Sequence, residues 1–591
     1  MKILRKFYHE PTRTNTKNEK ICNKSSCAYR RYDFGVPKVR LFGVPKVRWF
    51  VLSLLFFVLC LFFLSCDAED RVLFPVYGTS SALLSRSQPA REGAFDFSKQ
   101  KKFEYRFDKS FSVPENSSME IEYEINSDSA GDGSYSVVLS MGSVSWRLPA
   151  DINGIRYAVP VHDTFDGNFY FSAETTGKTG KKDLPEIKIH SIGFTDRYFG
   201  FVTNTDNFDI YTPFFTAYDD GSYKIDIPPA FMPKGYLTQI EARLSGERKV
   251  VLELGNKKIE TYKGIDLLFV PPALFAQGTA SLSLETPSAS KEVYSFLLTP
   301  RAPYVFPEPI KADPAFLLYW SKERWRNKSF EIFRWDRFPS LLIFDFADYA
   351  VQDKMLKRLA FFVEKAGFRG RLAPDSEIEE LHAWNAHDYR AQDLAAFFDA
   401  AKKANFPLLA EEKQLEKILL GERIIRESSG KIEAGEGGIV SISRESSDYL
   451  RYRFLTHEGF HGLFFIDADF RDFSKKRLEK LPAAAKRFIL SYFAYQQYDT
   501  KDEYLLINEF MAHILQQSDS QAAEYFGHYL PLRLLESSWR ASTLPPKDEA
   551  SNTWPALSTA FAVEGEAFSD YVNKRWGLAG GRVWGLQIKD K

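Results

Sequence analysis

The stretch "SSDYLRYRFLTHEGFHGLFF", residues 446–465, combines the start of a helix with the spacing H-E-x-x-H. Its first three residues are good N-cap residues, and no proline interrupts the stretch. Histidines four positions apart lie on the same face of an α-helix, one turn from each other, which is about the separation that one zinc ion needs. The pattern therefore predicts a helix here, with His457 and His461 as metal ligands.

Glu458 stands next to the first of these histidines, where a carboxylate can reach a water at the metal. We therefore expect Glu458 to act as a general base. Two satisfied core histidines are the alternative interpretation, which explains the shared face but not the adjacent glutamate. The last cysteine of the chain is Cys66, so a metal site beyond it must use His and carboxylate ligands.

A third ligand is expected from "DEYLLINEFMAHILQQ", residues 502–517. Glu509 lies there on the apolar side of a predicted helix, where a carboxylate is costly unless a cation or hydrogen bonds compensate. Asp467 is the alternative, because it stands where the metzincin pattern places its last ligand. That pattern requires a glycine for a sharp turn, and this sequence has Phe464 instead.

A helix offering Asn508-Glu509 downstream of H-E-x-x-H resembles the gluzincin metallopeptidases, the thermolysin-like group. The resemblance covers about residues 435–517 and no family is identified for the whole chain. It implies one Zn²⁺ ion, hydrolysis of peptide bonds by a zinc-activated water with Glu458 as base, and His513 as a neighbour of the ligands. It also implies that "GEGGIVSISRE", residues 435–445, contains an edge strand that pairs with extended substrate.

A further donor should stabilise the developing oxyanion. Tyr498, Tyr504, His513 and His528 all qualify, and the sequence does not choose among them. The polar stretch "HAWNAHDYRAQD", residues 382–393, either lines the cleft or forms a hydrogen-bonded loop and helix cap.

The beginning of the chain indicates export. Residues 1–50 contain thirteen Lys/Arg and three Asp/Glu, and an apolar run from Trp49 leads to Cys66. This segment resembles a bacterial lipoprotein signal, which implies cleavage before Cys66, a lipid on its thiol and an extracytoplasmic, membrane-anchored place in the cell envelope. An uncleaved membrane anchor is the alternative.

The rest of the chain divides by its hydrophobic pattern. Alternating apolar runs separated by turn clusters predict antiparallel β-sandwiches, and a proline-rich segment between Pro300 and Pro314 separates them from a mainly helical part. The predicted organisation is multidomain: 1–66 leader and signal peptide, 67–102 flexible tether, 103–200 β-sandwich, 201–300 second β-sandwich, and 301–591 an α+β zinc metallopeptidase domain.

The charge distribution bears on the partners. The chain has 78 Lys and Arg and 78 Asp and Glu, so the basic start leaves the remainder acidic. No basic surface for nucleic acid is expected. The expected partners are a peptide or protein substrate and a membrane. The rival interpretation is a surface lipoprotein that binds glycan or protein through its β-sandwiches and carries an inactive metallopeptidase-like domain.

Overall fold

The computed structural model describes four long uninterrupted stretches, residues 237–275, 304–365, 367–536 and 547–590. Between residues 94 and 301 it also describes shorter stretches, which contain the remaining strands. The leader, the signal-like segment with Cys66 and residues 67–93 of the expected tether lie outside the described residues. Among the helices that are described, none is both long and apolar enough to span a membrane.

The protein has a mixed α/β fold with several antiparallel sheets, as the alternating runs predicted. A four-stranded sheet has the order β2 (Lys102–Arg106), β7 (Asn168–Thr175), β4 (Tyr135–Met141), β5 (Val144–Leu148). A nine-stranded sheet has the order β1 (Ala94–Asp96), β8 (Glu186–Thr195), β3 (Ser118–Asn126), β6 (Ile155–Pro160), β10 (Phe208–Tyr211), β9 (Tyr198–Thr205), β18 (Val293–Arg301), β13 (Leu237–Leu244), β16 (Leu267–Val270). A six-stranded sheet has the order β11 (Phe215–Ala217), β12 (Tyr223–Asp226), β17 (Ser281–Leu284), β14 (Val251–Leu254), β15 (Lys257–Thr261), β26 (Leu586–Asp590).

These sheets do not respect the domain boundaries that the sequence predicts. The boundary after residue 200 falls inside β9, and the boundary after residue 300 falls inside β18. The nine-stranded sheet contains strands from both predicted sandwiches, and β26, near the end of the chain, pairs with β15. Strand spacing reveals where strands occur, but hydrogen bonds between distant strands decide which sheet each one joins.

The helical part is built on a mixed five-stranded sheet. Its order is β19 (Ile310–Ala312), β20 (Phe330–Trp335), β21 (Leu341–Phe346), β25 (Gly438–Ser443), β22 (His387–Arg390). Alternate residues of β21 belong to two different cores: Leu342 and Phe344 face one, Leu341 and Ile343 the other. The sheet is therefore covered on both faces, which explains why the β21 sequence LLIFDF is apolar except for one aspartate.

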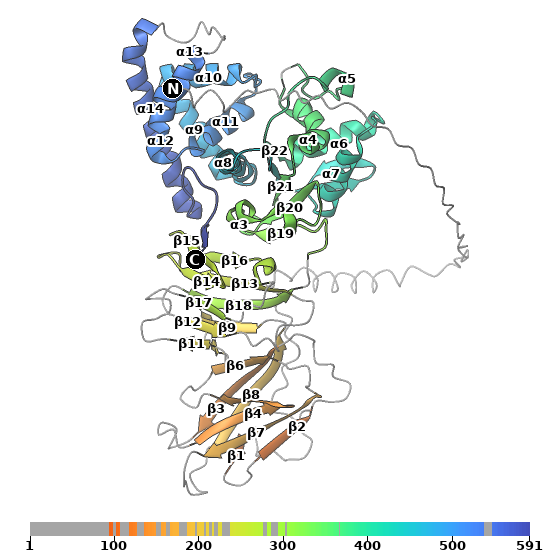
Figure 1. The fold of residues 1–591 in the computed structure, drawn as a ribbon, viewed down its shortest axis with the longest axis vertical. Helices are drawn as coiled ribbons and strands as arrows, with labels where there is room; N and C mark the ends of the chain where they lie inside the picture. Colours follow the sequence, from red (N-terminus) through yellow and green to blue (C-terminus); the bar gives the residue numbers. More distant parts are fainter. Residues whose placement is uncertain are drawn as a thin grey trace, which may run out of the picture. The chain divides into compact units, whose positions relative to one another are not determined.

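Helices cover the two faces unequally (Figure 1). One core lies between the sheet and α4 (Tyr349–Val363), α6 (Ala391–Lys403) and α7 (Ala410–Gly421). The other contains α3 (Pro314–Tyr319), α8 (Asp448–Ile466), α9 (Ala468–Lys480), α10 (Ala483–Tyr495), α11 (Glu503–Leu515), α12 (Asp519–Glu524), α13 (Leu530–Glu536) and α14 (Lys547–Trp576). The short helix α5 (Asp375–Ile378) and the hairpin of β23 (Ile425–Ser428) and β24 (Lys431–Ala434) complete this part.

The strand in "GIVSIS" is not an edge strand, so this prediction is wrong. β25 lies between β21, to which it is parallel, and β22, to which it is antiparallel. All six of its residues are buried, and a Cβ on Gly438 would lie 2.4 Å from the Tyr389 carbonyl oxygen. A short β-branched run fits an interior strand as well as an edge. Within the described sheet the edge next to α8 is β22, whose sequence HDYR has little strand character.

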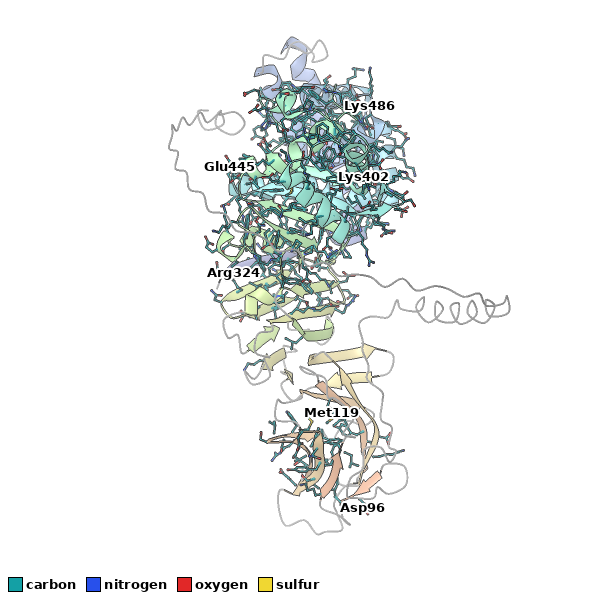
Figure 2. The ribbon with its side chains drawn as sticks, turned by 90° about the vertical axis from the view of Figure 1, so that its right-hand side faces the viewer. Asp96, Met119, Arg324, Lys402, Glu445 and Lys486 are labelled. Carbon is teal, nitrogen blue, oxygen red and sulfur yellow. The ribbon has the colours of Figure 1, made fainter. Side chains whose placement is uncertain are left out.

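Helix α8 is deeply embedded rather than amphipathic. Residues 455–464 are all buried, so the packed surface extends around the helix and is not confined to the face that carries the histidines. Two glycines allow this depth: a Cβ on Gly459 would lie 2.9 Å from Val583, and one on Gly462 would lie 3.0 Å from Leu341. Figure 2 shows how densely the described side chains fill this part of the chain. The close packing fixes the rotation of α8 and hence the direction of its histidines.

Candidate metal centre

Helix α8 holds the two histidines of the motif side by side. The Nε2 atoms of His457 and His461 are 3.0 Å apart, and their ring centroids are separated by 4.6 Å. His461 is fully buried and His457 is 9% exposed. The helix begins at Asp448 after Ser447, as the N-cap pattern predicts, although Ser447 makes no side-chain cap hydrogen bond.

Helix α11 brings Glu509 to the same point. Its Oε2 atom lies 3.6 Å from His457 Nε2, and its Oε1 atom lies 3.7 Å from His461 Nε2. The carboxyl group is buried, and Glu509 Oε2 has no hydrogen-bond partner among the described residues. The three residues that the sequence nominates as ligands thus converge from two helices, α8 and α11, that pack against each other.

The donor set and its spacing fit a zinc ion. Ligand atoms about 2.1 Å from a tetrahedral zinc lie roughly 3.4 Å from one another, and the three separations here, 3.0, 3.6 and 3.7 Å, bracket that value. Burial lowers the pKa of His457 to about 3 and that of His461 to about 4, so both imidazoles are neutral and each has a lone pair. Two imidazoles and a carboxylate are the ligand set of many catalytic zinc sites.

Glu458 is buried in the same helix and has a hydrogen-bonded neighbour from the polar stretch 382–393. Asp388, on the edge strand β22, hydrogen-bonds with Glu458, and its Oδ1 atom is 3.8 Å from His461 Nε2. Burial and the nearby carboxyls of Asp388 and Glu509 raise the pKa of Glu458 well above its ordinary value. Asp388, Glu458 and His461 form a second group whose ligand atoms could meet at one cation.

Four carboxyl groups gather around this centre, and the pKa of each is raised. Burial and the charge of Glu509 raise the pKa of Glu364 to about 8, and burial also raises the pKa of Glu509 itself. The pKa of Asp388 is raised well above its ordinary value by burial and by Glu364 and Glu509. Four carboxyls this close repel one another, so a divalent cation among them would stabilise their ionised forms.

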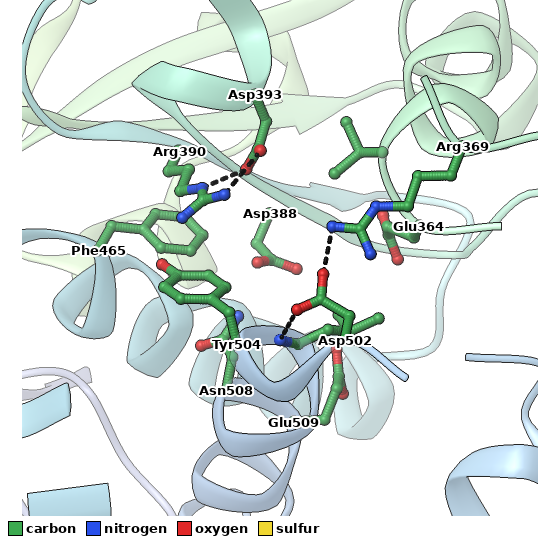
Figure 3. Close-up of a pocket in the computed structure, with 12 residues that line it drawn as sticks. Glu364, Arg369, Asp388, Arg390, Asp393, Phe465, Asp502, Tyr504, Asn508 and Glu509 are labelled. Atoms are coloured by element: carbon green, nitrogen blue, oxygen red, sulfur yellow. Dashed lines mark hydrogen bonds and ion pairs between the residues drawn. The ribbon is translucent and has the colours of Figure 1, made fainter. Parts of the chain in front are cut away.

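A pocket opens beside the centre (Figure 3). Asp388 points into it from β22, and Glu509 and Asn508 line it from α11. Two ion pairs flank the pocket, Arg390 with Asp393 and Arg369 with Asp502. The centre is therefore buried in the helical core but borders a polar opening on one side.

The four candidates for the oxyanion donor lie in different places. Tyr498 hydrogen-bonds with Glu509, and burial raises its pKa well above its ordinary value. The Nε2 atom of His513 is 3.6 Å from Glu509 Oε2, and its ring centroid is 4.8 Å from that of His457. Tyr504 lines the pocket under the guanidinium of Arg390. His528 is exposed, next to Tyr529.

Asp467 has a structural role instead of facing the centre. It ends α8, and as the N-cap of α9 its carboxylate accepts a hydrogen bond of 2.7 Å from the Phe470 amide. The same carboxylate also pairs with Arg575, with a shortest distance of 2.6 Å. The chain turns after Phe464 by ending the helix at Ile466, without the glycine that the alternative pattern requires.

Sequence reasoning missed Glu364, and it placed Asp388 only in a stretch that either lines the cleft or forms a loop and cap. The first alternative for the polar stretch 382–393 fits the structure, because Asp388 and Arg390 line the pocket. Residues 387–390 form β22, and Arg390 precedes α6 without a side-chain cap hydrogen bond. The many His, Asp and Arg residues in this stretch indicated a functional region. The pairing of β22 with β25, which directs Asp388 toward the centre, cannot be predicted from the local sequence.

Comparison with known proteins adds little. No family model and no curated protein match the chain. One solved structure, the M60 catalytic domain with the CBM51-1 and CBM51-2 domains from Clostridium perfringens ZmpB, is similar at 8% sequence identity with a TM-score of 0.12. The match covers 40% of this chain and 38% of that one. A TM-score of this size does not establish a shared fold, so the interpretation of the site depends on its own residues.

Proposed function

We propose that this chain is a zinc-dependent peptidase whose ion is held by His457, His461 and Glu509. The observation that carries the proposal is the convergence of these three buried side chains, which supply neutral nitrogen and carboxylate ligands at spacings suited to one zinc ion. When bound, zinc would polarise the carbonyl of the scissile bond and make a water easier to deprotonate.

The chain's own residues would move the protons. Glu458 would take a proton from the attacking water and later deliver it to the leaving amine. The charge of a divalent cation would counteract the burial that raises the pKa of Glu458, leaving it ionised and able to act as a base. The hydroxyl of Tyr498, already next to Glu509, is the donor that we assign to the developing oxyanion.

A peptide substrate is favoured by the edge strand beside the centre. β22 has one partner in the described sheet, β25, so its other edge could pair with an extended chain. Such a segment would pass the pocket that Asp388 and Tyr504 line. The backbone of an extended peptide would then lie along the centre, where the carbonyl of one peptide bond can approach it.

We further propose that the peptidase works outside the cytoplasm, anchored by a lipid on Cys66, with the antiparallel sheets that follow residue 94 between this anchor and the catalytic part. The support is the basic and apolar segment that ends at Cys66. Cys66→Ala is expected to abolish incorporation of labelled fatty acid and to release the protein from membranes or block its processing. An unchanged membrane fraction that retains residues 1–66 would favour the uncleaved anchor instead.

The rival function is a surface protein that binds glycan or protein through its sheets, with an inactive helical part. What speaks against it is that the base and all three ligands are present and buried together. Binding of zinc alone would not exclude the rival, because an inactive relative could keep its metal. Hydrolysis must therefore be measured as well.

The proposal predicts one zinc ion per chain and chelator-sensitive peptide hydrolysis. Purified protein would be analysed for metal and incubated at neutral pH with a broad peptide library, before and after zinc is removed with a chelator. We expect cleavage that disappears with the metal and returns when zinc is added back. Intact protein that takes up no zinc would overturn the proposal, and zinc uptake without any cleavage would favour the rival.

A further inference from the structure

Tyr498, the donor assigned to the developing oxyanion, lies in the loop between α10 and α11, so neither helix fixes its side chain. Its amide donates to the Phe493 carbonyl over 3.1 Å, and Gln497 before it has a positive φ of 66°. Arg369 stabilises the loop at one further point, through an ion pair with Asp502. A catalytic group on a loop stays within about 0.5 Å of its productive position only if neighbouring side chains restrain it. The contacts of the Tyr498 ring therefore decide how well its hydroxyl is placed.

Ring contacts place Tyr498 near the metal centre. Its ring centroid is 6.0 Å from that of Phe493, which in turn lies 5.6 Å from the ring of His513. The His513 ring is 4.8 Å from that of His457, the first proposed ligand. The backbone of Tyr498 also forms an isolated antiparallel β-bridge with Lys365, just beyond the end of α4. Tyr498 thus connects the surroundings of the ligands with the end of α4.

Trp384, from the polar stretch 382–393, packs against this tyrosine. The two ring centroids are 5.4 Å apart, with 31° between the ring planes. Two further contacts fix the indole: its Nε1 atom donates to Glu364 Oε2 over 2.9 Å, and the Lys365 ammonium lies 3.2 Å from its ring centroid. Glu364 is buried and lines the pocket shown in Figure 3. One side chain therefore contacts both a carboxylate of the pocket and the proposed oxyanion donor.

Lys365 restrains both aromatic residues at once. It is 8% exposed, so its ammonium has lost most of its contact with water. The face of an indole attracts a cation more strongly than the face of other aromatic rings, and the attraction grows when the cation is desolvated. Because the backbone of Lys365 pairs with Tyr498 while its ammonium lies on the ring of Trp384, this residue fixes the two rings relative to each other.

We propose that Trp384 and Lys365 are positioning residues that hold the ring of Tyr498 with its hydroxyl toward the metal centre. The inference rests on the proposed function, in which Tyr498 stabilises the developing oxyanion. Neither residue is a ligand of the ion. Their contribution should therefore appear in the stabilisation of the transition state and not in the affinity for zinc.

Three substitutions separate the ring contact, the hydrogen bond and the cation. Trp384→Leu removes the ring, Trp384→Phe keeps a ring but loses the N–H group, and Lys365→Gln removes the charge over the indole. An aromatic pair corresponds to about 2–13-fold in an equilibrium constant, and a cation–π contact to about 2–5-fold or more. We expect kcat to fall by about these factors in Trp384→Leu and Lys365→Gln, and by less than about twofold in Trp384→Phe.

Tyr498→Phe provides the reference for this series. Removal of one oxyanion donor typically costs about 10²–10³-fold in kcat, while the remaining ring can still pack against Trp384. In the Tyr498→Phe background, Trp384→Leu should cause no further loss, because the hydroxyl that it positions is gone. The same additional loss in both backgrounds would overturn the proposal.

The measurements are kcat and KM for a peptide identified in the library, the zinc dissociation constant, and thermal unfolding as a check on folding. A phosphinic peptide of the same sequence, whose tetrahedral phosphorus resembles the transition state, should lose affinity in parallel with kcat/KM. KM and zinc affinity should stay at the wild-type values. Trp325→Leu is the control for loss of an indole: Trp325 is also partly buried and lies near the guanidinium of Arg444, outside the pocket, and this variant should keep the wild-type kcat.

The possible outcomes distinguish this inference from the proposed function. Equal losses of kcat in Trp384→Phe and Trp384→Leu would assign the effect to the hydrogen bond with Glu364 and contradict the positioning of Tyr498. Weaker zinc binding in these variants would indicate a general disturbance of the centre and contradict it as well. If Trp384→Leu does not fold, an unchanged kcat in Lys365→Gln would overturn the proposal. A wild-type protein that neither binds zinc nor cleaves any peptide would instead overturn the proposed function.

Discussion

Glu458→Gln is expected to retain zinc and the fold while losing at least about 100-fold in turnover, because general acid–base help is typically worth about 10²–10⁴-fold. The substitution keeps the shape of the side chain and removes its capacity to take a proton. In the proposed reaction the same carboxylate acts twice, on the attacking water and on the leaving amine, so both transfers would suffer. Peptide binding should change little, so the loss should appear in kcat rather than in KM.

The test needs a control for the loss of a negative charge. Glu479→Gln makes the same chemical change on the exposed face of α9 and should cut at the wild-type rate. Asp388→Asn is a second probe, since it leaves Glu458 in place but alters its hydrogen-bonded neighbour. If the Glu458 variant cleaves as fast as the control, Glu458 is a bystander and the H-E-x-x-H mechanism is wrong even if zinc is present.

The parts of the fold that follow local rules could be predicted from the sequence. Helix α8 has an N-cap, no proline and periodic apolar residues, and α11 has a strongly apolar face, so both appear where their patterns indicate. Glu509 could be predicted as a metal ligand because a carboxylate on an apolar helix face is costly unless a cation or hydrogen bonds compensate its charge. That α8 and α11 pack against each other, across the intervening α9 and α10, follows from the tertiary fold and could only be inferred from the resemblance.

The parts that depend on strand pairing could not be predicted. Asp388 reaches the centre because β22 pairs antiparallel with β25, four residues matched in register from His387 to Arg390. Nothing local in "HDYR" indicates an edge strand, and nothing in "GIVSIS" indicates that it is an interior one. The domain boundaries failed for the same reason, since β18 and β26 join sheets whose other strands are far away in the sequence.

The final prediction concerns the identity of the third ligand. Glu509→Gln should weaken zinc binding by more than about 100-fold, the upper end of what an orienting neighbour contributes, because it replaces a charged ligand by a neutral amide. Asp467→Asn should leave zinc affinity unchanged. Asparagine is as good an N-cap as aspartate, and the lost pairing with Arg575 is a surface contact worth about 0–1 kcal/mol.

Zinc dissociation constants of the two variants, measured by chelator competition beside Glu503→Gln, would decide the question. Glu503 lies on the same helix as Glu509 but is exposed, with 70% of its side-chain surface accessible, so this control removes a charge from α11 without touching the centre.

Each of the three residues has a carboxylate, but the three carboxylates have different surroundings. That of Glu509 lies beside two imidazoles, that of Asp467 caps α9, and that of Glu503 faces solvent. Only the first has an unpaired buried oxygen, Oε2, whose nearest imidazole nitrogens are neutral and cannot balance its charge. A cation would stabilise this oxygen. We therefore expect Glu509→Gln to bind zinc far more weakly than Asp467→Asn or Glu503→Gln does. The reverse order between Glu509 and Asp467 would mean that the ion sits at the end of α8, and that the convergence on α11 is a buried hydrogen-bonded cluster without metal.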